Sequence, residues 1–402
     1  MRKAWKPVRL GELIDPKRPI TYGVVQPGDH DPNGVPLVRG GDFADGWRPI
    51  ERYRRISPAI DKTCARGRLK AGDLVITIKG DVGTAAITPD FLDGANISQT
   101  NARIAIDATK AVSKIVLSFL QSREGRRQVA AVTQVGAQPG LIFRDIESLR
   151  LNLPTLPEQQ KIAAILQTWD DALQGLSALR TAKSNALTGL TQRILGRGGL
   201  FPGKWPLKPL SAVATRVRRQ NGGGNHPVMT ISARSGFLLQ SDKFARDMAG
   251  TSVDRYTLLH EGEFAYNKGN SLAALYGCIY RLDRPTALVP FVYFCFALKP
   301  GHDHGFYEHL FAAGALNHQL SRLINSGVRN DGLLNLNVED FFGCKVPVPP
   351  LEEQRRIALA LSAAKQELSL LDEEIKALTR QKRGLMQKLL TGEWPVQVEK
   401  DI

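Results

Sequence analysis

"EEQRRIALALSAAKQELSLLDEEIKALTRQKRGLMQKLL", residues 352–390, resembles "PEQQKIAAILQTWDDALQGLSALRTAKSNALTGLTQRIL", residues 157–195 of the same chain. In both stretches, apolar residues recur at alternating steps of four and three, counted from Ile162 and from Ile357. A seam with this spacing, sustained over about five heptads, is typical of a coiled coil. In both stretches a proline stands just before an acidic first turn, and glycines follow the last turn, as at the starts and ends of helices. The sequence therefore predicts two long helices.

The first predicted seam is interrupted near mid-helix by Arg180 and Lys183, and the second is interrupted by Lys382. Neither helix can bury its seam alone, and each has one obvious partner of equal length. We therefore expect the helices to pair with each other, most simply antiparallel; two ordinary helices that are merely long are the alternative. The predicted seam consists of Ile162, Leu166, Trp169, Leu173, Leu176, Leu187, Leu190, Ile357, Leu361, Leu368, Leu371, Ile375, Leu378 and Leu385.

The segments before the two helices also correspond, although more faintly. Segments 69–87 and 259–279 share the pattern apolar–x–x–Gly–acid–apolar, and a tryptophan leads in both 4–13 and 204–213. The repeating unit is thus a strand-rich domain of about 150 residues followed by one long helix.

We predict an α+β fold with two similar mixed α/β domains, a long antiparallel two-helix coiled-coil spacer and a pseudo-two-fold internal repeat. Such a repeat gives one chain the symmetry of a homodimer and lets its two domains diverge. The predicted boundaries are, in chain order, domain 1 at 1–154, the central helix at 155–196, domain 2 at 197–349, the C-terminal helix at 350–392 and a tail at 393–402.

The chain of 402 residues has a formal net charge of +15. This excess favours a polyanionic partner, either nucleic acid or an acidic membrane surface. We expect no membrane span, because the longest apolar run, 286–298, is short and contains Pro290. The N-terminus lacks the apolar stretch of a signal peptide, and the four cysteines form no CxxC pair. We therefore expect a cytoplasmic protein without a structural zinc site.

The sequence contains no complete motif of a catalytic site. A DNA adenine methyltransferase would need an (Asn/Asp)-Pro-Pro-aromatic element, and VPPLEE at 348–353 lacks both ends of it. GGLFPGKW at 198–205 approaches a phosphate-binding loop, but Trp205 stands where a magnesium-binding hydroxyl is required. We therefore expect the chain to be non-catalytic and to carry no cofactor or metal.

Two stretches, LPTLPEQQKIAAIL (153–166) and VPPLEEQRRIALAL (348–361), each close a domain and open a helix. With them, the chain resembles the specificity subunits of type I restriction–modification enzymes over essentially its whole length. The resemblance implies that each domain is a target-recognition domain for one half of a split double-stranded DNA sequence, and that the helices dock two methyltransferase subunits. A motor–nuclease subunit would join them in host defence. S-adenosylmethionine would bind the methyltransferase subunits, and ATP with magnesium the motor–nuclease subunit.

The stretch 48–70 holds eight Lys or Arg residues against two acids. This composition predicts a face that contacts DNA phosphates, with Arg52, Arg54 and Arg55 as candidates, and such contacts set affinity rather than sequence. The alternative is a merely solvated surface.

For base readout we favour polar residues in glycine-containing turns between strands, because such turns can enter a groove. Lys79 and Lys268 are matched in placement, each just after a Gly–acid–apolar strand. For any one of these residues, the alternative is a turn stabiliser or a phosphate contact. The candidates are Arg39, Lys79 and Gln138 in the first domain and Arg234, Asn267, Lys268, Arg329 and Asn330 in the second.

The function predicted from the sequence is a DNA-reading specificity subunit whose complex methylates adenines and restricts unmodified DNA. One alternative is a non-restricting adaptor or scaffold of a related DNA-modification or defence system, which would bind duplex DNA without preference between sequences. A second alternative is a reader with a hidden nuclease activity, which would cut DNA as the purified chain alone.

Overall fold

The chain folds into two compact units, each containing one half of each long helix. Unit 1 comprises Met1–Ser177 and Glu374–Ile402, and unit 2 comprises Ala178–Glu373. The structure, a computed structural model, describes residues 5–44, 46–134, 140–196, 205–243, 253, 255–269, 273–324 and 333–398.

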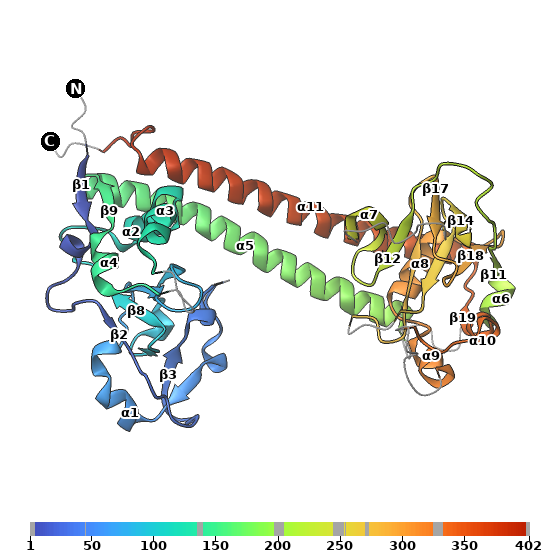
Figure 1. The fold of residues 1–402 in the computed structure, drawn as a ribbon, viewed down its shortest axis with the longest axis horizontal. Coiled ribbons are helices and arrows are strands. Elements are labelled where there is room, and N and C mark those ends of the chain that lie inside the picture. The colour runs from blue at the N-terminus through green and yellow to red at the C-terminus, as the bar shows by residue number, and fades with distance from the viewer. Residues whose placement is uncertain are drawn as a thin grey trace. The chain divides into compact units, whose positions relative to one another are not determined.

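Unit 1 mixes short strands with helices and leads into the first long helix, α5 (Figure 1). Its elements, in chain order, are β1 (Lys6–Arg9), η1 (Leu10–Leu13), β2 (Thr21–Tyr22), β3 (Val35–Val38), η2 (Gly40–Asp42), η3 (Ile50–Arg52), β4 (Arg54–Ile56), α1 (Pro58–Thr63), η4 (Ala65–Gly67), β5 (Leu74–Thr77), β6 (Ala85–Ile87), η5 (Asp90–Leu92), β7 (Asn96–Ile97), β8 (Asn101–Ile104), α2 (Ser113–Gln121), α3 (Arg123–Val132), α4 (Phe143–Ser148), β9 (Arg150–Leu153) and α5 (Leu156–Leu195).

Unit 2 is likewise mixed and leads into the second long helix, α11. Its elements are β10 (Leu207–Pro209), α6 (Leu210–Val213), β11 (Ala214–Arg216), β12 (Met229–Ser232), β13 (Gly236–Leu239), α7 (Gln240–Lys243), β14 (Thr257–His260), β15 (Phe264–Asn267), β16 (Cys278–Arg281), β17 (Thr286–Val289), β18 (Phe294–Leu298), α8 (His304–Ala312), α9 (Asn317–Leu323), α10 (Val338–Gly343), β19 (Lys345–Pro347) and α11 (Leu351–Leu390).

The main sheets of the two units are antiparallel and have corresponding strand orders. The four-stranded sheet of unit 1 has the order β2-β8-β5-β6, and that of unit 2 has the order β11-β18-β15-β16. In each unit the first strand also pairs antiparallel with the strand before the long helix, β1 with β9 and β10 with β19. The remaining strands differ: unit 1 adds the sheet β4-β3-β7, whereas unit 2 adds the pairs β12-β13 and β14-β17.

The Gly–acid pattern forms the same turn before β5 and before β15. Gly72 and Gly262 have φ angles of +86° and +84°, which glycine adopts at low cost. The carboxylates of Asp73 and Glu263 each accept a 2.8 Å hydrogen bond from the backbone N–H three residues earlier. The shared sequence pattern therefore has a local structural cause.

The same two carboxylates each bind an arginine from an earlier part of their unit. Arg18 donates to both oxygens of Asp73 at 2.7 and 2.6 Å, and Arg219 donates to both oxygens of Glu263 at 3.1 Å. A planar guanidinium suits this bidentate contact. Each pair fastens the turn before an inner strand of the main sheet to a segment next to that sheet's first strand, before β2 in unit 1 and after β11 in unit 2.

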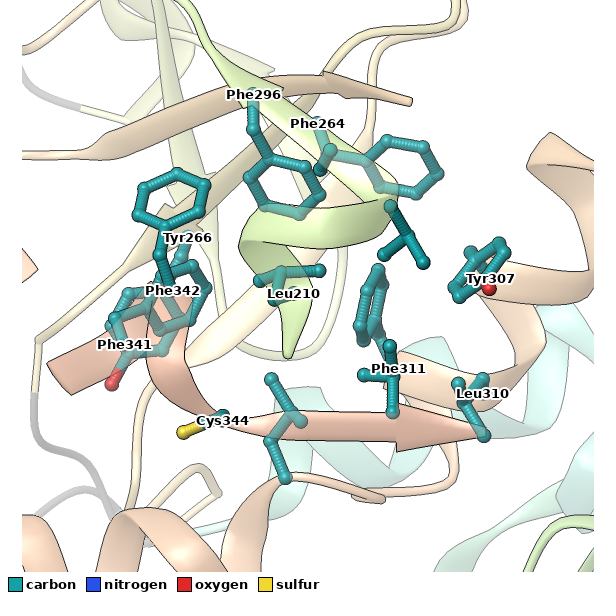
Figure 2. Packing of buried hydrophobic residues seen from close by; sticks show 14 of the residues in the cluster. Leu210, Phe264, Tyr266, Phe296, Tyr307, Leu310, Phe311, Phe341, Phe342 and Cys344 are labelled. Atoms are coloured by element: carbon teal, nitrogen blue, oxygen red, sulfur yellow. The ribbon is translucent and has the colours of Figure 1, made fainter. Parts of the chain in front are cut away.

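The cores of the two units use different side chains. In unit 1, Leu74, Ile76 and Ile104 of the main sheet are fully buried among other aliphatic residues. In unit 2, Phe264 stacks on Phe296 with ring centroids 5.3 Å apart, within a cluster of aromatic rings around Leu210 and Phe311 (Figure 2). Burial of one such side chain contributes about 1.5–3 kcal/mol.

A buried glutamine anchors the start of each long helix. Gln159 and Gln354 are both 1% exposed. The Gln159 side chain accepts a 2.9 Å hydrogen bond from the N–H of Val112 and donates 3.0 Å to the proline carbonyl five residues earlier. Gln354 accepts 2.8 Å from the N–H of Asp303 and donates 2.8 Å to the corresponding proline carbonyl. The repeated Glu–Gln sequence thus joins each helix to its own unit.

The helices α5 and α11 pack together and run antiparallel in both units. In unit 1 the early residues of α5 meet the late residues of α11, and in unit 2 the late residues of α5 meet the early residues of α11. The residues that share these clusters are Ile162, Leu166, Met386 and Leu389 in unit 1 and Leu187, Ile194, Ile357 and Leu361 in unit 2. Among the described residues, no helix is both long and apolar enough to cross a membrane.

Each charged residue that interrupts the predicted seam pairs with a carboxylate on the other helix. The pairs are Lys382 with Asp170, Arg180 with Asp372 at 3.0 Å, and Lys183 with Glu367 at 2.7 Å. A shift of one helix along the other would separate these charges, so the pairs favour one antiparallel register.

One predicted seam residue does not lie in the buried stripe. Leu190 is 40% exposed, whereas Leu195 is 8% exposed. A straight α-helix drifts by about 20° per heptad from a 3.5-residue seam, so the buried stripe has moved to other positions near this end of the helix. The other predicted seam residues are buried or half-buried.

Candidate nucleic-acid interface

Two exposed arginines are held by one buried carboxylate after strand β3. Asp42 is 2% exposed, and its carboxylate lies 3.7 Å from Nε of Arg39 and 3.2 Å from a terminal nitrogen of Arg48. The N–H of Arg39 also donates to Asp42 at 2.8 Å. Both guanidinium groups are thus positioned for an anionic partner. The sequence predicts Arg39 as a DNA-contacting residue but not Arg48. The signal in the sequence for Arg48 is its position at the start of the basic stretch 48–70.

Lys79 lies at the surface in the turn that joins β5 to β6. Its backbone N–H donates to the carbonyl of Thr100 at 3.4 Å. The Thr77 hydroxyl accepts a 3.0 Å hydrogen bond from the N–H of Thr84 across the turn. Gly80 has a φ of +82°, which lets the chain reverse next to Lys79. The turn is therefore well ordered and presents an exposed cation.

The fold brings the turns of Arg39 and Lys79 to the same end of the main sheet. A Cβ atom added at Gly40 would lie 3.1 Å from the methyl group of Thr77, so the two turns adjoin. The third candidate of this unit, Gln138, lies outside the described residues. Two separate turns thus place exposed cations together, which sequence spacing alone does not predict.

A cleft of about 1140 Å³ lies next to the β5–β6 turn in unit 1. At its edge the carboxylate of Asp170 accepts hydrogen bonds from Lys114 of α2 and Lys382 of α11. Burial alone would raise the pKa of Asp170, but these hydrogen bonds outweigh it and the pKa is lowered. The ionised carboxylate therefore ties the globular part of unit 1 to both long helices. Residues that line the cleft include Phe43, Trp47, Gly80, Val82, Arg126, Gln134, Lys114, Asp170 and Lys382.

The predicted phosphate-contacting arginines are partly used inside the protein. Arg54 donates to the carbonyl of Gly28, and Arg55 donates to the carbonyl of Gly34 at 3.0 Å. Both side chains are half-buried, whereas Arg52 is exposed. Each of these two arginines keeps further N–H donors, so its contact with a DNA phosphate stays a prediction.

The candidates of unit 2 have different surroundings. Arg234 is exposed in the turn between β12 and β13. The side chain of Asn267 donates to the carbonyl of Ile231 at 3.1 Å and accepts from the N–H two residues ahead at 2.9 Å. Asn267 therefore stabilises its turn, which is the alternative to base readout. Arg329 and Asn330 lie outside the described residues.

The predicted match between Lys79 and Lys268 is wrong by one residue. The carbonyls of Ile78 and Lys268 each accept a hydrogen bond from a leucine N–H of a later segment, at 3.0 and 2.8 Å. Lys268 thus corresponds to the buried Ile78, and its ammonium lies 5.3 Å from the ring centroid of Phe294. Because side chains alternate between faces along a strand, an offset of one residue changes the face.

Comparison with known proteins identifies relatives of this chain. Residues 2–181 match the family model described as the Type I restriction modification DNA specificity domain. The EcoBI specificity subunit of a type I restriction enzyme from Escherichia coli is 28% identical over 206 residues, which cover 50% of this chain and 43% of that protein. The MjaVIII specificity subunit from Methanocaldococcus jannaschii is 34% identical over 68 residues, or 17% of this chain and 16% of that protein. The aligned parts thus span less than half of each relative.

Comparison with solved structures shows a similarity in fold over nearly the whole chain. The S subunit of the type I restriction–modification system from M. genitalium has a TM-score of 0.58 and 15% identity, covering 98% of this chain and 96% of that one. A chain from a structure of complex assembly and conformational transition in the type I system also has a TM-score of 0.58, with 17% identity, covering 98% and 99%. Residues 2–181 are therefore similar in sequence to the type I restriction–modification DNA specificity domain, and nearly the whole chain is similar in fold to an S subunit of such a system.

Proposed function

We propose that this chain is the sequence-specific DNA-binding specificity subunit of a type I restriction–modification complex, and that units 1 and 2 each read one half of a bipartite target. One observation carries the proposal: the main sheets of both units have the same order of strands, and both units lead into a 40-residue helix anchored by a buried glutamine. We interpret this as a pseudo-two-fold repeat, which suits two half-sites. The exposed cations Arg39, Arg48 and Lys79 of unit 1 and Arg234 of unit 2 are the proposed DNA contacts.

The long helices are the proposed docking surface for two methyltransferase subunits. Four leucines on α5 and α11 are exposed although the two helices pack together: Leu179 at 44%, Leu190 at 40%, Leu359 at 74% and Leu370 at 57%. These exposed leucines are the proposed contacts with a methyltransferase subunit. In the proposed complex S-adenosylmethionine binds the methyltransferase subunits, ATP and magnesium bind a motor–nuclease subunit, and this chain supplies DNA recognition.

The test is co-expression with candidate methyltransferase subunits, followed by single-molecule mapping of methylated adenines. Replacing residues 1–150 with the corresponding domain of a related chain should change one half of the methylated sequence and leave the other half intact. A change in both halves contradicts independent reading. Methylation without sequence preference would favour a scaffold or adaptor, and cutting of DNA by the purified chain alone would favour a hidden nuclease.

A second arm tests the helices as a spacer. Seven residues inserted after Ser177 in α5 and seven after Glu373 in α11 would lengthen both helices by about 10 Å while keeping the seam register. The gap between half-sites should grow by about three base pairs, and both half-sites should stay unchanged. The matched control is the insertion in α5 alone, which breaks the register of the Lys183–Glu367 pair. An unchanged gap in the double insertion contradicts the spacer.

A further inference from the structure

Unit 1 contains a strongly basic pocket apart from the turns of Arg39 and Lys79. It has a volume of about 500 Å³ and lies between the segment before β2, the short helix η4 and strand β8. Among the described residues that line it, Asp93 is the one carboxylate. The basic residues of its lining are Lys17, Arg18, Arg66, Arg68, Lys70 and Arg103.

Arg103 is a buried cation without a counter-ion in the described part of the chain. It is 3% exposed, and its terminal nitrogens donate to the carbonyls of Arg18 at 3.4 Å and Pro19 at 3.1 Å. Its Nε is buried with no hydrogen-bond partner among the described residues. A guanidinium has five N–H donors, so most of them remain available. A buried charge of this kind is costly unless an anion compensates it.

Two carboxylates near the pocket already have arginine partners, and Asp93 accepts a 3.0 Å hydrogen bond from the N–H of Ala71. Asp73 binds Arg18, and Asp61 binds Arg68 through Nε at 2.8 Å. Lys17 and Lys70 are exposed and form no ion pair with described residues. The pocket therefore keeps an excess of positive charge.

Two further properties of the pocket agree with this excess. Burial, followed by repulsion from the charge of Arg18, lowers the pKa of Arg103. Arg66 lies at the pocket with its guanidinium carbon 5.2 Å from the ring centroid of Tyr22, a contact that leaves its charge unneutralised. For Arg103, attraction by Asp73 and Asp15 opposes these effects without outweighing them, so positive charge exceeds negative charge in the pocket.

Unit 2 shows that the shared frame does not need an arginine at this position. Arg103 pairs with Val75 across β8 and β5, and Cys295 pairs with Ala265 at the corresponding place across β18 and β15. Cys295 is 1% exposed, and burial raises the pKa of its thiol to about 12, which keeps it neutral. The buried cation is thus a feature of unit 1 alone and calls for a specific explanation.

We propose that this pocket binds one phosphate group of the DNA backbone, with Arg103 at its floor and Lys17, Arg66 and Lys70 at its mouth. The proposal rests on the proposed function and names a DNA contact within it. An oxyanion would supply the counter-charge that Arg103 lacks and would accept its spare N–H groups. A contact to the backbone sets affinity and register but carries no sequence information. The pocket would therefore strengthen binding to every duplex.

The test measures the affinity of the full chain, in complex with its methyltransferase subunits, for its target duplex and for an unrelated duplex over a range of salt concentrations. Arg103→Met and, separately, Lys70→Ala should weaken both affinities about fivefold to tenfold and lower the salt slope by about one. Lys70 is exposed, so its variant folds even if Arg103→Met does not. Arg9→Ala, an exposed cation of the same unit, is the control and should leave the slope unchanged.

An unchanged salt slope in both variants, with sequence preference intact, overturns the pocket and leaves the proposed function standing. A wild-type complex without sequence preference contradicts the proposed function instead. A separate arm compares Tm in inorganic phosphate and in chloride at equal ionic strength. Phosphate should raise the Tm of the wild type more than that of Arg103→Met. If only this stabilisation depends on Arg103 and the DNA affinity does not, the site takes a free anion and the backbone assignment is wrong.

Discussion

Unit 1 packs its main sheet with aliphatic side chains, whereas unit 2 fills the corresponding positions with aromatic rings. Leu74 and Ile104 pair across the sheet in unit 1, and Phe264 and Phe296 pair at the same place in unit 2. The strand orders correspond nevertheless. The difference shows that backbone pairing and burial define the order of the strands in both main sheets. The core of each unit is then filled with different side chains, aliphatic in unit 1 and aromatic in unit 2.

The polar residues that hold the frame are more alike than the apolar ones. In both units an arginine binds the carboxylate of the Gly–acid turn, and a buried glutamine anchors the long helix. A buried polar group needs partners with defined geometry, so few replacements are tolerated. By contrast, Arg103 and Cys295 differ in charge at matching positions, which leaves room for the two units to contact DNA differently.

The largest effect that we predict is in the aromatic core. Phe296→Ala should destabilise unit 2 by about 3–5 kcal/mol, because Phe296 is fully buried among other rings. Phe296→Ile, which introduces the side chain of unit 1 at this position, should cost less. The measurement is urea unfolding with hydrogen exchange resolved for each unit. Phe291→Ala, at a residue that is 50% exposed, is the control and should change little. A small cost for Phe296→Ala would show that the rings are dispensable.

The next effect compares the two helix anchors. Gln159→Ala and Gln354→Ala should each cost about 1–3 kcal/mol, because each leaves a buried N–H and a buried carbonyl without partners. Thermal unfolding measures both. Gln174→Ala in α5 and Gln366→Ala in α11, at exposed positions, are the controls. Clearly unequal losses for the two anchors would break the comparison between the units.

A smaller effect concerns pH. The pKa of Asp170 is lowered in the folded chain, so its ionised form stabilises the protein above the unfolded pKa of about 3.9, and this contribution is lost as pH falls through the lower folded value. Asp170→Asn should remove about 1 kcal/mol at neutral pH and flatten the acid side of the profile of Tm against pH. Asp372 of unit 2 has a carboxyl group that is 41% exposed, so Asp372→Asn should cause a smaller loss of stability and a smaller change in the profile of Tm against pH. Equal profiles for the two variants would count against a stronger role for the half-buried cluster around Asp170 in unit 1.

The smallest effect is a gain in stability. Gly189→Ala and Gly384→Ala, at matching positions of the two helices, should each stabilise the free chain by about 0.5–1 kcal/mol, because an added Cβ meets nothing within 4 Å. Calorimetry on the free chain measures this gain. Gly125→Ala is the matched control and should destabilise, because its Cβ would lie 2.0 Å from the carbonyl oxygen of Phe119. If either alanine variant lost stability, the added methyl group would have to meet other atoms, and the expectation that it points into open space would be wrong.

The two long helices could be predicted from the sequence because their pattern is local. The predicted spans 155–196 and 350–392 lie within two residues of the observed Leu156–Leu195 and Leu351–Leu390. The Gly–acid turn could be predicted for the same reason, since its carboxylate accepts a hydrogen bond from a backbone N–H only three residues earlier. Heptad spacing, helix ends and tight turns depend on residues a few positions apart, and the sequence states these directly.

The tertiary structure alone decided which polar residues remain available for a partner. The side chains of Arg54, Arg55 and Asn267 each donate to a carbonyl group 21 to 36 positions away along the chain, so part of their donor capacity is already used. The same holds for Arg103, whose isolation depends on where Arg18 and Asp73 lie after folding. A residue's type and spacing are properties of the sequence, but its free donors and its burial depend on segments that only folding brings together.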